Sequence, residues 1–332
     1  MTGKSGRLKN VYLTIVNGKY ALRGYALFLS IQPYLKNNIF VVYCVDEIAK
    51  SILEPFVNCQ FRVIEIKSFE NRDLLSLKDI RKTNEFCWTC KPFIIENAFS
   101  LDKDIDWGVY LDSDMMSFGD PDSGLPECSN THVVLTPHRP SDRLFAEQMP
   151  VTGNFNAGYA AFRNTDHGRK ALQWWRQKCT ELCPSLPVNG IYADQKYLDE
   201  LSQIFLGVEV DAHLGLNVAP WNVEGVELAK QGDRVLVNGL PLLIYHMQAF
   251  RYYGPHISDH YDGNKKLSRG TRSLIYKPYE VLLRRSLLEL SAFNSGYVQE
   301  PDAKFLTSDL LIREFKKLVK RISNLTVFGC RF

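Results

Sequence analysis

The sequence lacks any apolar run long enough to cross a bilayer, which takes about 20 residues. It also lacks an apolar segment of the secretory kind behind its polar, basic first residues, MTGKSGRLKN. Charge of neither sign prevails, because 40 Lys and Arg residues stand against 37 Asp and Glu residues, a net charge of +3. So slight an imbalance gives no reason to expect a nucleic-acid partner.

The eight cysteines lack the regular spacing of a disulfide framework. Without a secretory segment, this usage predicts reduced thiols and a cytoplasmic protein. Cys87 and Cys90 have the C-x-x-C spacing of redox sites, and Cys179 and Cys183 could complete a zinc site with them. The first pair lies deep in a chain too long for a thioredoxin-like domain, and three residues separate the second pair. We therefore expect structural thiols, with redox or metal roles as the alternatives.

Hydrophobic residues make up 45% of the chain, which is ample for a packed core. Buried strands are predicted at 11–16, 39–45, 61–66, 107–111, 133–136, 155–162, 208–210 and 242–245. Helices are predicted at 20–35, 88–99 with Pro92 near its start, 166–182 and from about 193 to 205. Strands that alternate with helices are typical of a parallel sheet covered by helices, so the predicted fold class is α/β.

The stretch 107–121, WGVYLDSDMMSFGDP, is the most informative one, because a buried strand runs directly into Asp112-Ser113-Asp114. Ligands bind at the carboxyl ends of the strands in an open α/β sheet. Two Asp side chains at such an edge can hold a hard divalent cation, which shares its oxygen ligands with a substrate diphosphate. The stretch therefore suggests a metal–diphosphate site, and a solvated Asp pair in a turn is the alternative.

Four segments in order along the chain resemble the GT-A glycosyltransferases: YLDSD, FNAGYAAFRN, ADQKYLDE and a strand that ends in His246. Within that group, the bacterial nucleotide-diphospho-sugar transferases related to glycosyltransferase family 8 are the most similar. The similarity extends to EFCWTCKPFIIENAF, ALQWWRQKC, NVAPWNV and YHMQAFR, and it covers about 11–253. It implies a GT-A fold, which is a Rossmann-like, mixed and mainly parallel sheet flanked by helices. The catalytic domain would span 8–260, and a basic, helical extension would span 261–332.

The resemblance implies that Asp112, Asp114 and His246 hold Mn²⁺ or Mg²⁺ against the donor diphosphate. The cation would cancel the charge that builds on the leaving nucleoside diphosphate. Imidazole favours Mn²⁺ over Mg²⁺. The alternative for His246 is a histidine at a strand end whose hydrogen bonds are satisfied within the protein.

The resemblance also implies residues that contact the nucleotide-sugar donor. Asn17 and Tyr20 follow the first strand and Asp46 follows the second, where the family seats the base and the ribose. Ser113 lies between the two metal ligands and would face the donor with them. Lys91 would face the donor phosphates or sugar. The alternatives are packing at a helix start for Tyr20 and a solvated helix charge for Lys91.

Three residues resemble the family's catalytic positions. Asn156 has a side-chain amide that can hold a sugar hydroxyl. Gly158, two residues later, permits close backbone approach. Asp194 and Gln195 resemble the pair near the anomeric carbon, where a carboxylate stabilises an oxocarbenium-like transition state. Judged without the resemblance, Asp194 would be the N-cap of its helix. Trp221 would either stack on an acceptor sugar or pack in the core.

The function implied is transfer of a hexose from a nucleotide-diphosphate sugar, expected to be a UDP-sugar, to a glycan hydroxyl. Anomeric retention and a role in bacterial surface polysaccharide or lipopolysaccharide synthesis are part of this expectation. A sugar nucleotidylyltransferase is an alternative, but it needs a Gly-rich phosphate loop where this chain has only Gly18. A haloacid-dehalogenase-like phosphatase would carry its D-x-D on the first strand. A non-catalytic carbohydrate-binding protein with a vestigial site is the remaining alternative.

The chain becomes basic and polar after Tyr261 and then helical. One helical face would carry Phe315, Leu318, Val319 and Ile322, and the other would carry Lys316, Lys317, Lys320 and Arg321. We expect an ordinary surface helix. Peripheral contact with the inner face of a membrane is the alternative.

Overall fold

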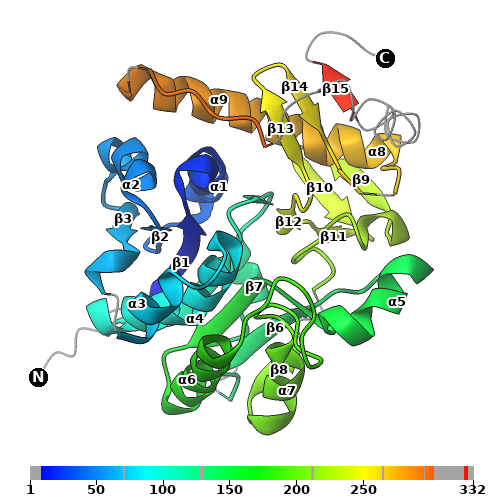
Figure 1. The fold of residues 1–332 in the computed structure, drawn as a ribbon. Helices are drawn as coiled ribbons and strands as arrows, with labels where there is room; N and C mark the ends of the chain where they lie inside the picture. The colour runs from blue at the N-terminus through cyan, green and yellow to red at the C-terminus, as the bar shows by residue number, and fades with distance from the viewer. Residues whose placement is uncertain are drawn as a thin grey trace, which may run out of the picture.

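A mixed sheet of seven strands forms the centre of the computed structural model, which describes residues 9–69, 72–127, 130–210, 213–263, 265–294, 296–302 and 325–327 (Figure 1). The strand order is β3-β2-β1-β4-β7-β6-β8. The bounds are β1 Lys9–Val16, β2 Ile39–Cys44, β3 Phe61–Glu65, β4 Ile105–Leu111, β6 Val133–Pro137, β7 Phe155–Arg163 and β8 Val208–Val210. Continuous runs of Val, Ile, Leu and Tyr form the central strands because both faces of the sheet are covered.

The direction of β7 decides which residues meet at the carboxyl edge of the sheet. The pairs β3/β2, β2/β1, β1/β4 and β6/β8 are parallel, whereas β7 runs antiparallel to both β4 and β6. The first residues of β7 therefore lie beside the last residues of β4, with Tyr159 opposite Leu111. The mixed, mainly parallel sheet expected from the sequence is confirmed.

Helices cover both faces of this sheet. The helices on one face are α1 Ala21–Ile31 and α2 Glu47–Leu53, and α9 Lys277–Phe293 packs on the outside of α1. Those on the other face are α3 Arg72–Lys78, α4 Thr83–Leu101, α6 Asp166–Glu181 and α7 Tyr197–Ile204. Alternate residues of β1 serve the two faces: Tyr12 belongs to the first hydrophobic cluster, and Val11 and Leu13 belong to the second. This alternation is the two-residue period of a strand buried on both sides.

Smaller sheets lie beyond the carboxyl edge of the main sheet (Figure 1). They comprise β5 Met115–Ser117 with β12 Ile244–His246, then β9 Leu228–Gln231 with β10 Arg234–Val237 and β11 Leu240–Pro241, and lastly β13 Arg251–Gly254 with β14 Ile257–Asp259 and β15 Leu325–Val327. The short helices α5 Arg143–Thr152 and α8 Arg269–Thr271 accompany them.

The chain after residue 260 shares its core with the first helix. Helix α9 packs against α1, and Tyr276 and Tyr279 are fully buried in the same cluster as α1. Arg23 of α1 forms a buried ion pair with Asp302. The predicted amphipathic helix at 315–322 lies outside the described residues. No described helix is long and apolar enough to span a membrane.

Three predicted boundaries were wrong. Helix α4 begins at Thr83 rather than near residue 88, because the Glu85 carboxylate accepts a hydrogen bond from the Lys82 amide and closes the helix start. Pro92 therefore lies inside the helix and not near its start. The helix predicted from about 193 begins at Tyr197, so Asp194 is not its N-cap. The strand predicted at 242–245 is observed as β12, Ile244–His246, so the histidine lies inside the strand.

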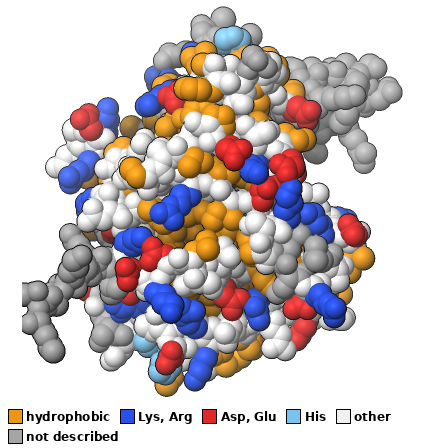
Figure 2. Space-filling view, turned by 90° about the vertical axis from the view of Figure 1, so that its left-hand side faces the viewer, with side chains coloured by type: hydrophobic (Ala, Val, Ile, Leu, Met, Phe, Trp, Pro, Cys, Tyr) orange, Lys and Arg blue, Asp and Glu red, His pale blue; other side chains and the backbone are white. Residues whose placement is uncertain are grey.

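Charges of both signs alternate over the face shown in Figure 2, around a central hollow with apolar side chains. No single-sign patch dominates this view, in keeping with the small net charge of the whole chain.

Candidate active site

A cavity of about 720 Å³ opens along the carboxyl edge of the sheet. Its walls come from the turn after β1, the start of α4, the end of β4, the loop after β6, helix α5, the start of β7, the segment before α7 and the strand β12. A volume of this size is typical of a site for a nucleotide-sized ligand.

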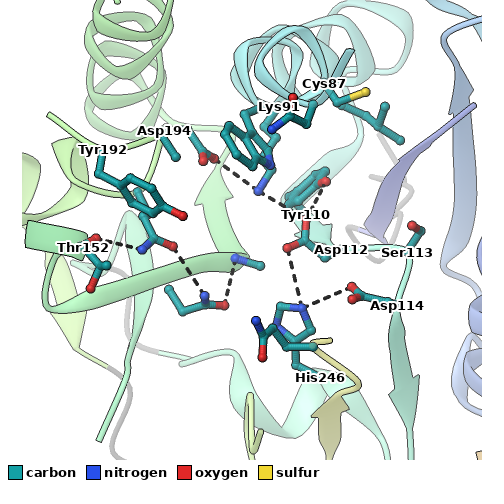
Figure 3. A pocket seen from close by; sticks show the side chains of 18 of the residues that line it. Cys87, Lys91, Tyr110, Asp112, Ser113, Asp114, Thr152, Tyr192, Asp194 and His246 are labelled. Atoms are coloured by element: carbon teal, nitrogen blue, oxygen red, sulfur yellow. Dashed lines mark hydrogen bonds and ion pairs between the residues drawn. The ribbon is translucent and has the colours of Figure 1, made fainter. Parts of the chain in front are cut away.

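Three candidate metal ligands, Asp112, Asp114 and His246, meet inside this cavity (Figure 3). We call these three side chains the metal group. The His246 Nε2 atom lies 3.1 Å from Asp114 Oδ1 and 3.8 Å from Asp112 Oδ2. One ligand atom of each residue lies within 4.8 Å of the other two, and no other group of three or more His, Cys, Asp or Glu residues does so in the described part of the chain. The cysteines of the C-x-x-C pair are therefore not part of such a group.

The pairing of β5 with β12 brings the histidine to the two aspartates. Strand β5 follows the aspartates directly, and its Met115 is the register partner of His246. The amide of Met247 donates to the Asp114 carbonyl over 2.8 Å, which ties the two segments together beyond the ladder. Residues far apart in sequence thus converge through a short antiparallel pairing.

Gly158 of β7 makes the convergence possible. A Cβ atom at this position would lie 2.8 Å from His246 Cε1, 2.9 Å from Asp112 Oδ2 and 2.6 Å from Asn156 Oδ1. Real Cβ atoms do not approach other atoms so closely. The close backbone approach expected of this glycine is therefore present, and it is an approach to the metal group itself.

Asp114 and His246 shift each other's pKa. Burial opposes charge on His246, yet the Asp114 carboxylate raises the pKa of the imidazole above its ordinary value. Burial likewise works against the charge of Asp114, but His246 lowers the pKa of that carboxyl. Two carboxylates and one imidazole suit a divalent cation such as Mn²⁺, which would replace the proton between them.

Lys91 of α4 connects the metal group to Asp194. Its Nζ lies 3.2 Å from Asp112 Oδ1 and 3.2 Å from Asp194 Oδ2, and it donates to the Ala157 carbonyl over 3.1 Å (Figure 3). Burial disfavours the ammonium, but the two carboxylates raise the pKa of Lys91 above its ordinary value. The alternative of a solvated helix charge is wrong, because the Lys91 side chain is only 3% exposed.

Asp194 is placed by the segment before α7 rather than by a helix start. Its neighbour Ala193 has a positive φ of 51°, and the side chain is buried against Lys91. Burial, despite the ammonium, raises the pKa of Asp194 above its ordinary value. The arrangement holds a carboxylate beside the metal group without a direct contact between them.

Tyr110 is a site residue that sequence reasoning missed. Its hydroxyl donates to Asp112 Oδ1 over 2.8 Å, and the Lys91 ammonium lies 4.7 Å from its ring centroid. Hydrogen bonds of this kind orient metal ligands. The available signal was strand periodicity, since residues two apart on a strand share a face.

A chain of amide groups fixes Asn156 and Gln195. The Gly158 amide donates to Asn156 Oδ1 over 3.0 Å, and Asn156 Nδ2 donates to Gln195 Oε1 over 3.5 Å. Gln195 Nε2 in turn donates to the Thr152 carbonyl over 2.7 Å. Asn217, another residue that sequence reasoning missed, donates to Asn156 Oδ1 over 3.1 Å from a backbone with φ +52°. Backbone groups at both ends of this series of hydrogen bonds therefore fix the orientation of the two side-chain amides.

The residues predicted to contact the nucleotide-sugar donor divide into two groups. Asn17, Tyr20 and Ser113 line the cavity. Asp46 does not line it, because its carboxylate caps α2 by accepting from the Ala49 amide over 2.8 Å and also accepts from the Gly18 amide over 3.1 Å. Asp46 is therefore placed to hold the turn that carries Asn17 and Tyr20.

Trp221 lines the cavity but is almost completely buried. Its ring makes edge contacts with His246 and His138, each with 5.4 Å between ring centroids. The burial of Trp221 supports the core role that the sequence suggested, and stacking on an acceptor sugar stays a prediction.

Two proteins of one bacterium are similar to this chain in sequence over most of its length. No family model matches the chain. The uncharacterized protein YfnD of Bacillus subtilis strain 168 is 28% identical over 309 residues, which cover 90% of this chain and 98% of YfnD. The uncharacterized protein YfnF of the same strain is 28% identical over 251 residues, 74% of this chain and 82% of YfnF.

Among solved structures, the apo form of the glycosyltransferase GlyE from Streptococcus pneumoniae TIGR4 matches with a TM-score of 0.50 at 14% identity. The match covers 85% of this chain and 64% of the GlyE chain. At this identity the likeness concerns the fold alone. The chain has the fold of that glycosyltransferase, so the GT-A architecture expected from the sequence is confirmed.

Proposed function

We propose that this protein is a metal-dependent glycosyltransferase, which moves a hexose from a nucleotide-diphosphate sugar to a hydroxyl of a glycan. The convergence of Asp112, Asp114 and His246 in a cavity at the carboxyl edge of the sheet carries the proposal. A sugar nucleotidylyltransferase is a weaker explanation, because Gly18 is the only glycine in the turn after β1.

Asp112, Asp114 and His246 would hold Mn²⁺ or Mg²⁺, with Mn²⁺ favoured by the imidazole. The bound ion would supply electrostatic stabilisation of the leaving diphosphate. Tyr110 and Lys91 both contact Asp112 Oδ1, which leaves Oδ2 as the oxygen that faces His246. Their contacts would hold the carboxylate in place whether or not the ion is bound.

The donor would lie with its nucleotide toward β1 and its sugar toward β7. Asn17, Tyr20 and Ser113 would contact the nucleotide, which we propose to be UDP. Asp46 would support this end by holding Gly18 rather than by touching the donor. Lys91 would contribute positive charge near the donor from its place between two carboxylates.

The sugar would lie near Asn156, Asp194 and Gln195. The Asp194 carboxylate, beside Lys91, would stabilise positive charge at the anomeric carbon. We propose retention by front-face displacement: the bond from the anomeric carbon to the phosphate oxygen breaks, and the bond to the acceptor oxygen forms on the same face. The departing phosphate oxygen would take the acceptor proton.

The setting proposed for the reaction is the cytoplasm, in synthesis of bacterial surface polysaccharide or lipopolysaccharide. Reduced cysteines favour that compartment. Membrane contact through 315–322 stays a prediction, since that segment lies outside the described residues. We further propose that 8–260 supplies the catalytic machinery and that 261–332 is an extension to it.

A thermal-shift panel of UDP- and GDP-sugars, with and without Mn²⁺, tests the proposal. A ligand at 100 times its Kd stabilises the folded state by about 2.7 kcal/mol, so one donor should raise the Tm by several degrees, and only with metal. Asp112→Asn should remove this response. No response to any nucleotide sugar with any metal would refute the function.

Turnover tests the role of Asp194. Asp194→Asn should abolish sugar transfer while the donor-induced Tm shift persists. Asp166→Asn, on an exposed helix start away from the cavity, is the matched control and should leave both unchanged. Full turnover in Asp194→Asn would refute the assignment. Binding of a sugar without turnover in the unmodified protein would favour the non-catalytic carbohydrate-binding alternative.

A further inference from the structure

Seven of the residues that line the cavity come from the loop after β6, from α5 or from the segment beside them, and none of the seven is acidic or basic apart from one histidine. They are His138, Pro140, Phe145, Gln148, Met149, Thr152 and Trp221. In the sheet order, β4 and β7 separate β1 from β6, so these residues lie across the metal group from Asn17 and Tyr20. We call this set the β6-side subsite.

Burial disfavours charge on the histidine of this subsite. Burial lowers the pKa of His138 to about 4, although hydrogen bonds to backbone groups of the loop before β7 partly oppose the shift. Its Nδ1 atom is buried without a hydrogen-bond partner, and so is the Trp221 Nε1 atom. Because both atoms are shielded from solvent, they offer no charge to a ligand in the cavity.

The cations nearest the subsite are already engaged. Arg139 donates to the carbonyls of His213 and Leu216, over 3.2 Å and 2.5 Å. Lys265 lies 3.0 Å from Asp142 Oδ2 and donates to Ser141. None of the described side chains that line the subsite can therefore neutralise a carboxylate or phosphate there.

The two cations on or beside α5 do not line the cavity. Arg143 pairs with Glu147 over 2.6 Å, and Lys196 donates to the Pro150 carbonyl over 3.0 Å and pairs with Asp199 over 3.1 Å. The apolar part of the subsite, by contrast, is well supplied with Phe145 and Met149 beside Trp221. Aromatic and apolar walls suit the less polar face of a sugar ring.

We propose that the β6-side subsite selects an uncharged sugar as the acceptor and rejects a sugar ring that bears a carboxylate or phosphate. The proposal rests on the proposed function, because it names the acceptor class of that same site. A neutral ring can pack its less polar face on Phe145, Met149 and Trp221 and leave its hydroxyls to water. An anionic ring leaves a charge unpaired, which should lower kcat/KM about 10- to 100-fold.

Matched acceptor pairs test the proposal with the full chain, Mn²⁺ and the donor found by thermal shift. Each pair is a methyl hexopyranoside and its uronate, in the gluco, galacto and manno series, so that only the group at C6 changes. Transfer and binding in the presence of UDP are both measured. Neutral members should be bound and glycosylated, and uronates should be at least about 10-fold poorer. Uronates that match or exceed the neutral members would overturn the proposal, as would failure of every neutral member to bind.

A charge-addition variant sharpens the test. Gln148 is exposed and lines the subsite, so Gln148→Lys adds an ammonium there and should raise the ratio of uronate to neutral kcat/KM about 10-fold. Gln177→Lys adds the same charge on an exposed turn of α6 and should leave the ratio unchanged. An unchanged ratio in Gln148→Lys would count against the proposal.

Donor hydrolysis measured without an acceptor distinguishes failure of the acceptor assignment from failure of the proposed function. If the donor is bound and hydrolysed but the neutral sugars are ignored, the acceptor assignment is wrong and the proposed function stands. If no donor is bound or hydrolysed, the proposed function fails, and the acceptor assignment falls with it.

Discussion

At Gly158 the backbone of β7 runs against three functional side chains at once. Two of them are Asp112 and His246, and the third is Asn156, whose amide direction the Gly158 amide sets. A single methyl group at this position would press on the metal group and on a catalytic candidate together. The requirement here is space, since the φ angle of Gly158 is not in the left-handed region.

Gly158→Ala should therefore damage metal binding more than it damages the fold. Overpacking costs about 1–3 kcal/mol, whereas displaced ligands should lower metal affinity about 10- to 100-fold. Mn²⁺ affinity measured by calorimetry and stability measured by denaturation separate the two effects. Gly270→Ala is the control, because the nearest non-neighbouring atom to its added methyl lies 3.7 Å away. Undiminished Mn²⁺ affinity in Gly158→Ala would contradict the prediction.

The sequence alone identified those site residues whose type indicates their chemical role. Asp112, Asp114 and His246 are ligand types at recognisable places, and the structure brings them together. Tyr110 and Asn217 were missed because they act through hydrogen bonds to other site residues. Such indirect roles depend on contacts between segments, which residue type does not reveal.

Among the elements, helix α1 is held by a buried ion pair to the far end of the described chain. Arg23 pairs with Asp302, and the Tyr252 amide donates to the same carboxylate over 2.7 Å. Gln299 donates to the Lys19 carbonyl over 2.9 Å, just before α1. These contacts support the turn that carries Tyr20 into the cavity.

Asp302→Asn should destabilise the protein by about 3–5 kcal/mol, because it leaves the buried Arg23 guanidinium without its counter-charge. The measurement is the free energy of unfolding from urea denaturation. Glu147→Gln removes a partner from the exposed Arg143 pair and should cost less than about 1 kcal/mol. Equal effects of the two variants would show that the buried pair contributes no more than a surface one.

The strands of the central sheet were predictable, whereas the direction of one of them and the smaller sheets beside them were not. Strands and helices follow from hydrophobic periodicity, and most predicted strands lie within a residue or two of the observed bounds. The sequence FNAGYAAFR predicts a buried strand but carries no mark of direction. Strand direction depends on partners along the sheet, and β7 runs antiparallel to β4 and β6.

For the whole molecule, the chain beyond residue 260 contributes to the main core. Ile275, Tyr276, Tyr279 and Leu290 are fully buried in the cluster that also contains Tyr12 and Leu22. The boundary that we propose near residue 260 would therefore separate the catalytic residues from an extension. The segments before and after it would still share one hydrophobic core and fold together.

A chain that ends at residue 260 should therefore fail to fold. It would expose the apolar surface that α9 covers, at about 25 cal/mol for each Å². Circular dichroism of the fragment and limited proteolysis of the full chain test this expectation. A protease-resistant fragment that ends near residue 260 and retains near-ultraviolet dichroism would contradict it.

The place of His246 on β12 has a consequence for biosynthesis. Translation delivers Asp112 and Asp114 long before the imidazole, and the β5 residues beside them find their described partner only when β12 emerges. A nascent chain on the ribosome thus holds an incomplete ligand set while the strands of the central sheet appear. Under the proposed function, the ion would bind only after β12 has paired with β5, so depletion of divalent metal from a cell should yield folded, inactive protein rather than misfolded protein.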